Sequence, residues 1–171
     1  MVNLYNALTV RLVLVYYPVK SIRDIDVSWS LFGGPWNRKL LEVLGEPVSL
    51  NDIEHRILRP IWRDPRIHYA VNCASIGCPN LQPVAFSGAN AEALLDKAAR
   101  EYVNHRRGAD VEDGRLMASK IYLWFDDDFG GEDGVLLHLR RYAAPELAGA
   151  LTGVHSIDDY EYDWGLNESG S

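Results

Sequence analysis

The sequence predicts an α+β fold: one compact domain over residues 1–171, with a small, mainly antiparallel sheet packed by helices. Two observations lead to this prediction. Several segments repeat apolar residues at helical spacing, whereas others are short β-type runs bounded by turn residues. A chain of 171 residues with 47% hydrophobic content is long enough to bury one core. No internal repeat and no interdomain linker interrupts it.

Four segments favour helices. Residues 2–17 combine helical spacing of leucines with locally β-branched positions, and we interpret them as a mostly buried helix that ends before Pro18. Residues 89–105 carry the clearest helical apolar stripe of the chain. Residues 135–142 and 145–151 are predicted to form two further helices.

Four other segments favour strands. Residues 39–50 indicate a hairpin around a Gly-Glu-Pro turn, and residues 110–116 are typical of a second hairpin tip. Residues 66–73 are apolar, rich in β-forming residues and bounded by turn residues, which predicts a short strand. Residues 160–164 alternate aromatic and acidic side chains, as a half-buried final strand does.

Composition excludes several classes of function. A formal net charge of -7 and a pI near 5.2 argue against nucleic acid as a partner, because phosphates require clustered basic residues. No apolar run is long enough to predict a membrane span, and no signal peptide is visible at the start. The expected partner is therefore a small-molecule or peptide substrate. The oligomeric state is left open.

Cofactor sites are not predicted. The chain has no Gly-x-Gly-x-x-Gly or Walker loop for a nucleotide. Its Cys-x4-Cys pair with upstream histidines does not match the short paired spacings of structural zinc. The carboxylate run Asp126–Asp128 is more typical of a solvated turn than of a calcium or magnesium loop. We expect no cofactor and no metal.

Residues 64–81 hold both cysteines and one of the five histidines. A thiol attacks only as a thiolate, so a nucleophilic cysteine requires a nearby imidazole, and the imidazole requires an orienting group. The candidates lie within 25 residues of each other. They are Cys73 or Cys78 as nucleophile, His55 or His68 as base, and Glu54 or Asn72 as the orienting group.

The pairing of cysteine and histidine stays open. In the predicted strand, alternation places His68 and Cys73 on opposite faces unless the strand ends or bulges. Cys78 could return to the His68 face through the loop, and His55 could equally pair with Cys73. The alternative is structural, with Cys73 as a small buried hydrophobe and His68 as a satisfied strand histidine. In an oxidising compartment, the two cysteines could instead pair with each other.

A short helix is predicted between Asn51, which can cap it, and Pro60. His55 and Arg59 lie four residues apart on one face of this helix, with Glu54 beside them. We expect this face to point into the site, with Arg59 paired to a carboxylate or to an anionic substrate group. An ordinary exposed helix face is the alternative.

These segments together resemble the DUF547 family of uncharacterised proteins, found in bacteria and, with coiled-coil regions, in plants. The matching pieces are residues 3–8 (NLYNAL), 17–22 (YPVKSI), 49–59 (SLNDIEHRILR), 64–68 (DPRIH), 73–79 (CASIGCP) and 162–167 (YDWGLN). The bacterial branch fits best. Family members usually carry further N-terminal helices and many bacterial ones a signal sequence, so this start looks truncated and the compartment stays open.

The resemblance implies a shared pocket. Its polar members would be Glu54, His55, Arg59, His68, Cys73 and Cys78. Plant relatives keep residues like Cys73-Ala-Ser75 but not the second cysteine, which favours Cys73 as the nucleophile.

The leading hypothesis is a thiol-dependent hydrolase or acyltransferase that acts on an amide or thioester. One cysteine would lie within hydrogen-bond reach of His55 or His68, directly or through one water. The N–H groups of residues 75–77 would hold the oxyanion. Substrate-binding candidates are Arg59, Asn72, Asn6 and Ser75. A non-catalytic peptide- or ligand-binding module is the main alternative, and a redox or metal role of the two cysteines a lesser one.

Overall fold

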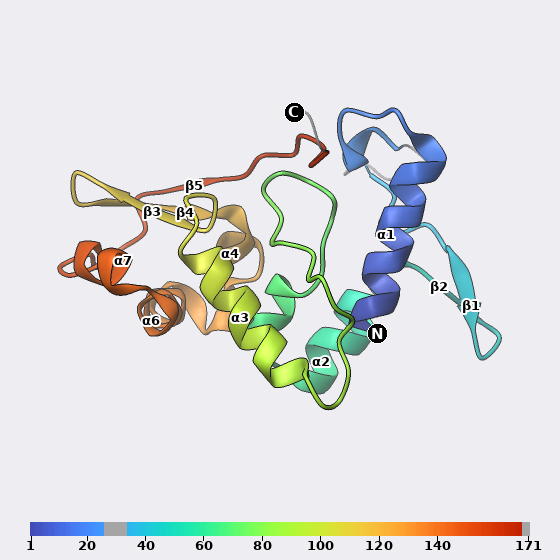
Figure 1. Cartoon of the computed structure of the whole chain (residues 1–171), viewed down its shortest axis with the longest axis horizontal. Coiled ribbons are helices and arrows are strands. Elements are labelled where there is room, and N and C mark those ends of the chain that lie inside the picture. The colour runs from blue at the N-terminus through green and yellow to red at the C-terminus, as the bar shows by residue number, and fades with distance from the viewer. Residues whose placement is uncertain (26–33, 169–171) are drawn as a thin grey trace.

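The computed structural model describes residues 1–25 and 34–168 and confirms the α+β class (Figure 1). Helices make up 48% of it and strands 12%, in one two-stranded and one three-stranded sheet. In chain order, the elements are α1 (Val2–Tyr16), η1 (Ile22–Asp24), β1 (Leu41–Val43), β2 (Glu46–Val48), η2 (Asp52–Leu58), α2 (Arg59–Trp62), η3 (Pro65–Tyr69), α3 (Ala91–Val103), β3 (Ala109–Glu112), β4 (Arg115–Ser119), α4 (Lys120–Trp124), α5 (Asp126–Phe129), α6 (Gly131–Tyr142), α7 (Pro145–Ala150) and β5 (Asp159–Glu161).

The N-terminal part forms one packing unit. Helix α1 ends before Pro18, as its sequence predicts, because the residue before a proline is driven into extended backbone. The predicted first hairpin is present, with β1 antiparallel to β2. A cluster of buried apolar residues joins α1, the hairpin and η2; its members are Tyr5, Leu8, Val48, Leu50, Ile53, Leu58, Ile67 and Val71.

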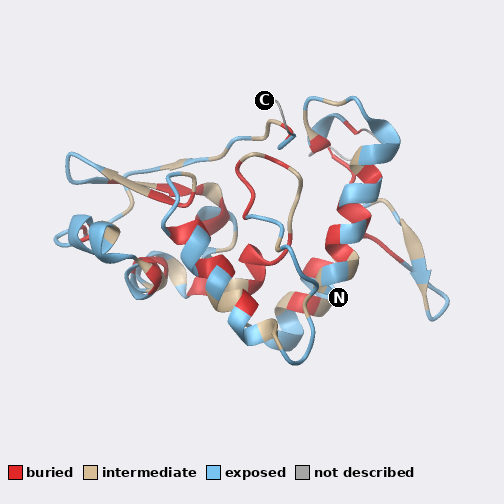
Figure 2. Ribbon diagram, viewed as in Figure 1, coloured by how far each residue is buried: buried red, intermediate tan, exposed pale blue. Residues whose placement is uncertain are grey.

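The larger core lies under the three-stranded sheet. Strands β3 and β4 form the second predicted hairpin, and β5 adds to β4 in parallel. Helices α3, α4 and α6 bury their apolar faces in this core, where Tyr102, Tyr122 and Leu139 are almost completely buried. Figure 2 shows buried positions, in red, on these helices beside exposed positions in pale blue. The predicted helices over residues 89–105, 135–142 and 145–151 are confirmed as α3, α6 and α7.

The helix that carries Glu54 starts and ends elsewhere than predicted. Asn51 is not its cap: Ser49 and Asp52 cap it, since the Ser49 N–H donates to the Asp52 carboxylate and the Asp52 N–H donates to Ser49 Oγ. Pro60 does not stop it either, because the helix continues through α2 to Trp62. Its middle, η2, is a π-helix, in which the Arg59 N–H donates to the carbonyl five residues back.

The predicted strand over residues 66–73 is wrong. Asp64 accepts a hydrogen bond from the Arg66 N–H, and Pro65 occupies the first helical position, so the segment opens as the 3-10 helix η3. Its apolar run is continuous because Ile67 and Tyr69 are buried against different neighbours, not because the backbone is extended. The argument that alternation separates His68 from Cys73 therefore does not apply.

The loop after η3 lies between α1 and α3 (green in Figure 1). On the α1 side, Asn6 donates to the Ala70 carbonyl and accepts from the Asn72 N–H. On the α3 side, the Tyr102 hydroxyl donates to the Gly77 carbonyl. Gly77 allows a close approach of the C-terminal segment, because a Cβ there would lie 3.0 Å from the Asp163 backbone. These contacts fix the loop that carries both cysteines.

Candidate functional site

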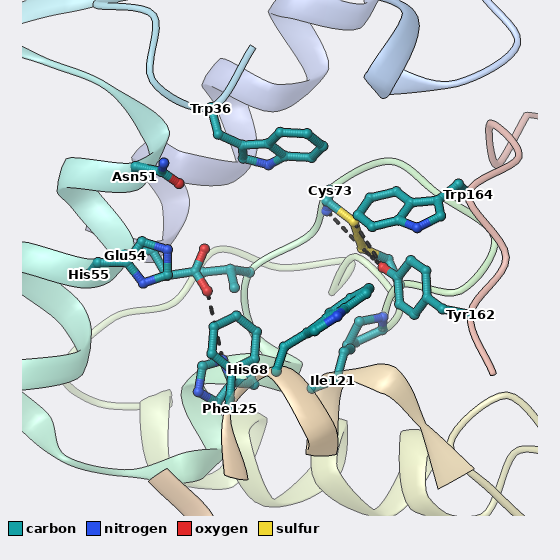
Figure 3. Close-up of a pocket in the computed structure, with 14 residues that line it drawn as sticks. Trp36, Asn51, Glu54, His55, His68, Cys73, Ile121, Phe125, Tyr162 and Trp164 are labelled. Carbon is teal, nitrogen blue, oxygen red and sulfur yellow. Dashed lines mark hydrogen bonds and ion pairs between the residues drawn. A yellow bond between two sulfur atoms is a disulfide. The ribbon is translucent and has the colours of Figure 1, made fainter. Parts of the chain in front are cut away.

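A cavity of about 280 Å³ lies where the cysteine loop, η2, α4 and the C-terminal segment meet (Figure 3). It is lined mostly by apolar and aromatic side chains, with a few polar groups among them. The lining residues are Trp36, Asn51, Glu54, His55, His68, Val71, Cys73, Cys78, Pro79, Ile121, Trp124, Phe125, Tyr162 and Trp164. All five predicted catalytic candidates, Glu54, His55, His68, Cys73 and Cys78, are in this set.

Aromatic rings form one wall of the cavity. Trp164 packs against three of them: its ring centroid lies 4.7 Å from that of Tyr162, 5.5 Å from Trp124 and 5.7 Å from Trp36. The Trp36–Trp164 pair is edge-to-face. These four rings come from three distant segments, so the wall exists only in the folded chain. Such a wall offers a large contact area to an apolar or planar ligand.

Glu54 and His68 form the polar end. Both side chains are buried, with 6% and 3% of their surface exposed. Glu54 Oε1 lies 3.7 Å from His68 Nδ1, and Figure 3 shows the carboxylate pointing toward the ring. Burial raises the pKa of Glu54, but the imidazoles of His68 and His55 and the Tyr5 hydroxyl lower it by more, so its pKa falls below the usual range. Glu54 is therefore ionised at neutral pH.

Asp128 holds His68 from the other side. His68 Nε2 lies 2.7 Å from Asp128 Oδ2, and the ring stacks on Phe125 with the centroids 4.0 Å apart. Arg59 pairs with the same carboxylate in a bidentate manner, at 2.5 and 3.0 Å. Burial raises the pKa of Asp128, but Arg59 and His68 lower it below its usual value, so the carboxylate accepts from both neighbours.

Arg59 also reaches His55. Its Nη1 donates to His55 Nδ1 across 3.1 Å, which leaves the proton of the neutral ring on Nε2. Burial lowers the pKa of His55, and Arg59 lowers it further against the opposing effect of Glu54. His55 is thus neutral at pH 7. The expectation that Arg59 pairs with a carboxylate is confirmed.

Cys73 and Cys78 form a disulfide at the opposite end of the cavity. The Tyr162 hydroxyl lies 3.0 Å from Cys73 Sγ and 3.3 Å from Cys78 Sγ, and the Cys73 N–H donates to Cys78 Sγ. Ser75 Oγ is 3.1 Å from Cys73 Sγ. Among the residues that the structure describes, no hydrogen bond joins either sulfur to His55 or His68, so the expected direct contact is not formed.

The four predicted substrate-binding residues do not line the cavity. Asn6 and Asn72 fix the cysteine loop: Asn72 donates to the Pro79 carbonyl and accepts from the Ala74 N–H. Ser75 is fully buried beside Tyr162, and Arg59 is occupied by Asp128. A direct role of these four in binding a substrate stays a prediction.

The expected oxyanion loop is not free. The Ile76 N–H donates to the Gly165 carbonyl and the Gly77 N–H to the Asp163 carbonyl, each at 2.8 Å. Ser75 forms a bridge with Leu166. We expected these N–H groups to face a substrate, but Ile76 and Gly77 donate theirs to carbonyls of the C-terminal segment.

Sequence reasoning missed Asp128 and the aromatic wall. Asp128 lies in a run of three carboxylates that predicts a solvated turn, and only this one faces inward. The signal that could have found it is Arg59, for which the sequence predicts a carboxylate partner without naming one. Neither Trp124 nor Tyr162 was among the site candidates, and Tyr162 was interpreted only as part of the final strand and of the family pattern.

A family model described as a protein of unknown function, DUF547, matches residues 1–103. The chain belongs to the DUF547 family. The matched range includes Glu54, His55, His68 and both cysteines of this DUF547 protein, whereas Asp128 and Tyr162 lie beyond it. Comparison with curated proteins and with solved structures gave no match.

The described residues, 1–25 and 34–168, contain neither a three-ligand metal cluster nor a membrane-spanning helix. No group of three or more His, Cys, Asp or Glu side chains there is arranged to hold a metal ion. In the same residues, no helix combines the length and apolar character that crossing a bilayer requires.

Proposed function

We propose that this DUF547 protein binds a small molecule or a peptide side chain in the cavity between Glu54 and the cysteine loop. One observation carries the proposal. A single hollow joins an extensive aromatic wall to a few convergent polar groups, the arrangement typical of ligand sites. The wall would contact the apolar part of the ligand, and Glu54 and His68 would hold its polar end.

The exposure of the wall supports this proposal. Trp124 has 43% of its surface exposed although it contacts both Tyr162 and Trp164. A tryptophan that served only to fill the core would be expected to be buried more completely. Its open face therefore remains available to a ligand.

A screen of small fragments by ligand-observed NMR tests the proposal, with Trp124→Ala as the site variant. Trp62→Ala is the matched control, because Trp62 is 58% exposed and does not line the cavity. Loss of an aromatic contact is expected to weaken fragment binding about tenfold. Fragments should bind wild type and Trp62→Ala alike. Equal binding to Trp124→Ala, or no fragment that binds, would contradict the proposal.

A thiol-dependent hydrolase or acyltransferase acting on an amide or thioester is the second candidate. The surroundings of Cys73 favour it: this cysteine is partly exposed, whereas Cys78 is buried, and two hydroxyls lie close to its sulfur. Burial raises the pKa of Tyr162 to about 12, so its hydroxyl keeps its proton and can donate to a thiolate.

In this candidate reaction, a dithiol reductant first opens the disulfide to two thiols and is itself oxidised. His68 or His55 then takes the proton of the Cys73 thiol, the thiolate attacks the carbonyl carbon to form a thioester, and the same imidazole returns the proton to the leaving group. Water or an amine releases the acyl group and restores the thiol. The tyrosine and serine hydroxyls would stabilise the thiolate before attack.

Iodoacetamide labelling of the reduced protein at neutral pH tests this second candidate. Cys73 is expected to react well ahead of Cys78, and tandem mass spectrometry of the peptide that begins at Ile67 separates the two. The Tyr162→Phe variant should slow labelling of Cys73, while Tyr160→Phe, on β5, should not. Labelling of both cysteines only on denaturation would exclude a nucleophilic Cys73.

A further inference from the structure

Two hydrogen-bond acceptors face each other at the polar end of the cavity. Glu54 Oε1 and His68 Nδ1 lie 3.7 Å apart, too far for a direct hydrogen bond and close enough for one atom to bridge them. Both side chains line the cavity, and both are more than nine-tenths buried.

The two ring nitrogens of His68 face different carboxylates: Nε2 faces Asp128, and Nδ1 faces Glu54. Asp128 is ionised and can only accept, so Nε2 donates to it. In the tautomer with its one proton on Nε2, Nδ1 carries a lone pair. Within the part of the chain that the structure describes, Nδ1 has no hydrogen-bond partner. A buried acceptor without a donor is uncommon and points to a group that supplies one.

The charges around Glu54 indicate which group this is. The positive charge of Arg59 is directed to Asp128 by two hydrogen bonds, and its third donor goes to His55. His55 is neutral at pH 7 for the reason given above. Among the described residues, no arginine or lysine forms an ion pair with Glu54, whose carboxylate faces the cavity.

We infer that the cavity takes a primary ammonium group on an apolar or aromatic body, with the ammonium bridging Glu54 Oε1 and His68 Nδ1. This rests on the proposed ligand-binding function and names its ligand class. An ammonium nitrogen can lie about 2.9 Å from both acceptors at once. Its charge complements Glu54, and the aromatic wall attracts the cation and packs the body.

Three benzyl compounds separate the contributions of charge and of hydrogen-bond donors to binding. Benzylammonium carries both charge and N–H donors, benzyltrimethylammonium carries charge without donors, and benzyl alcohol carries a donor without charge. Quenching of tryptophan fluorescence, with Trp36, Trp124 and Trp164 in the wall, reports binding. Benzylammonium is expected to bind at least about tenfold more tightly than either of the others, as charge-assisted hydrogen bonds require.

The variant Glu54→Gln keeps the shape and removes the charge. It should weaken the binding of benzylammonium about tenfold or more and leave the binding of benzyl alcohol unchanged. Glu46→Gln, on the exposed strand β2, removes the same charge elsewhere and should change neither. Circular dichroism checks the fold, and the comparison of the three probes on wild type stands even if Glu54→Gln fails to fold.

The outcomes are distinct. If benzyl alcohol or benzyltrimethylammonium binds as tightly as benzylammonium, the ammonium inference is wrong and the ligand-binding function stands. If Glu54→Gln folds and binds benzylammonium like wild type, the inference is also wrong. If no probe binds, the inference is overturned, and the fragment screen decides the proposed function separately.

Discussion

Two histidines, the buried His68 and the half-buried His138, have different surroundings. Each has one ring nitrogen without a hydrogen-bond partner in the described chain. His68 lies between the carboxylates of Glu54 and Asp128 and lines a cavity. His138 lies on α6 among aromatic rings, with the centroid of Tyr142 at 4.8 Å and that of Phe129 at 5.0 Å.

The surroundings decide what an unpartnered nitrogen means. Next to His138 lie the packed aromatic rings of Phe129, Tyr142 and Tyr69, so a neutral ring serves as a flat side chain that packs against them. Next to His68 there is open volume and an ionised carboxylate, so the lone pair faces a place where a ligand can lie. The same residue is thus structural in one region and a binding candidate in the other.

Truncating one side chain in each region should give the largest difference in the free energy of unfolding. Leu139→Ala next to His138 deletes a completely buried side chain and is expected to cost about 3 kcal/mol of unfolding free energy. Trp124→Ala in the cavity wall should cost about 1 kcal/mol, since this ring is partly exposed. Urea unfolding measures both. Equal costs would show that the cavity wall is ordinary core.

Lowering the pH should destabilise the protein through the proton that His138 gains on unfolding. Burial lowers its pKa to about 4, with Arg141 and Arg66 adding to the effect and Asp64 opposing it. An unfolded histidine titrates near pH 6.5, so between about pH 6.5 and 4 only the unfolded chain gains this proton. Stability therefore falls as the pH falls through this window, by about 3 kcal/mol.

The variant His138→Phe cannot take up this proton. Between pH 7 and pH 4, its free energy of unfolding should therefore fall less than that of wild type, by the amount given above. Urea unfolding at several pH values gives the difference between variant and wild type. A difference that does not change with pH would show that His138 titrates as it does in the unfolded chain.

The carboxylate run provides a smaller, matched test of the His68 side. Asp128→Asn removes the charge that holds Arg59 and His68 and should cost about 1 kcal/mol, since the Arg59 and Asp128 side chains are 27% and 28% exposed and partly screened by water. Asp127→Asn changes an exposed neighbour and should cost nothing measurable. Thermal unfolding of both variants decides it. Equal effects would mean that Asp128 is a solvated turn residue, as the sequence alone predicts.

The fold was predictable where one face of an element is buried. Leucine spacing in α1 and the apolar stripe of α3 have the period of a helix because only one side meets the core. The η3 segment was not predictable, because it is buried on several sides and its unbroken apolar run resembles that of a buried strand. Asp64 followed by Pro65 is the helix-start signal that the run obscured.

The site was predictable only within its local segments. Glu54, His55 and His68 lie close in the sequence, and the structure brings them to one cavity. Asp128 lies 60 residues beyond His68 and is one of three identical neighbours, so spacing alone cannot select it. The rings of Trp36 and Trp164 meet only through tertiary packing. Sequence patterns carry no information on such contacts.

One measurement tests the central claim, that the Glu54–His68 end of the cavity receives a ligand. Nitrogen-15 NMR of protein labelled at its histidines distinguishes a protonated ring nitrogen from one with a free lone pair. We predict that the Nδ1 signal of His68 is that of a free lone pair at pH 7 and moves when benzylammonium is added, while both signals of His138 stay in place. A His68 signal that does not respond to saturating benzylammonium, or that moves together with His138, would contradict the account.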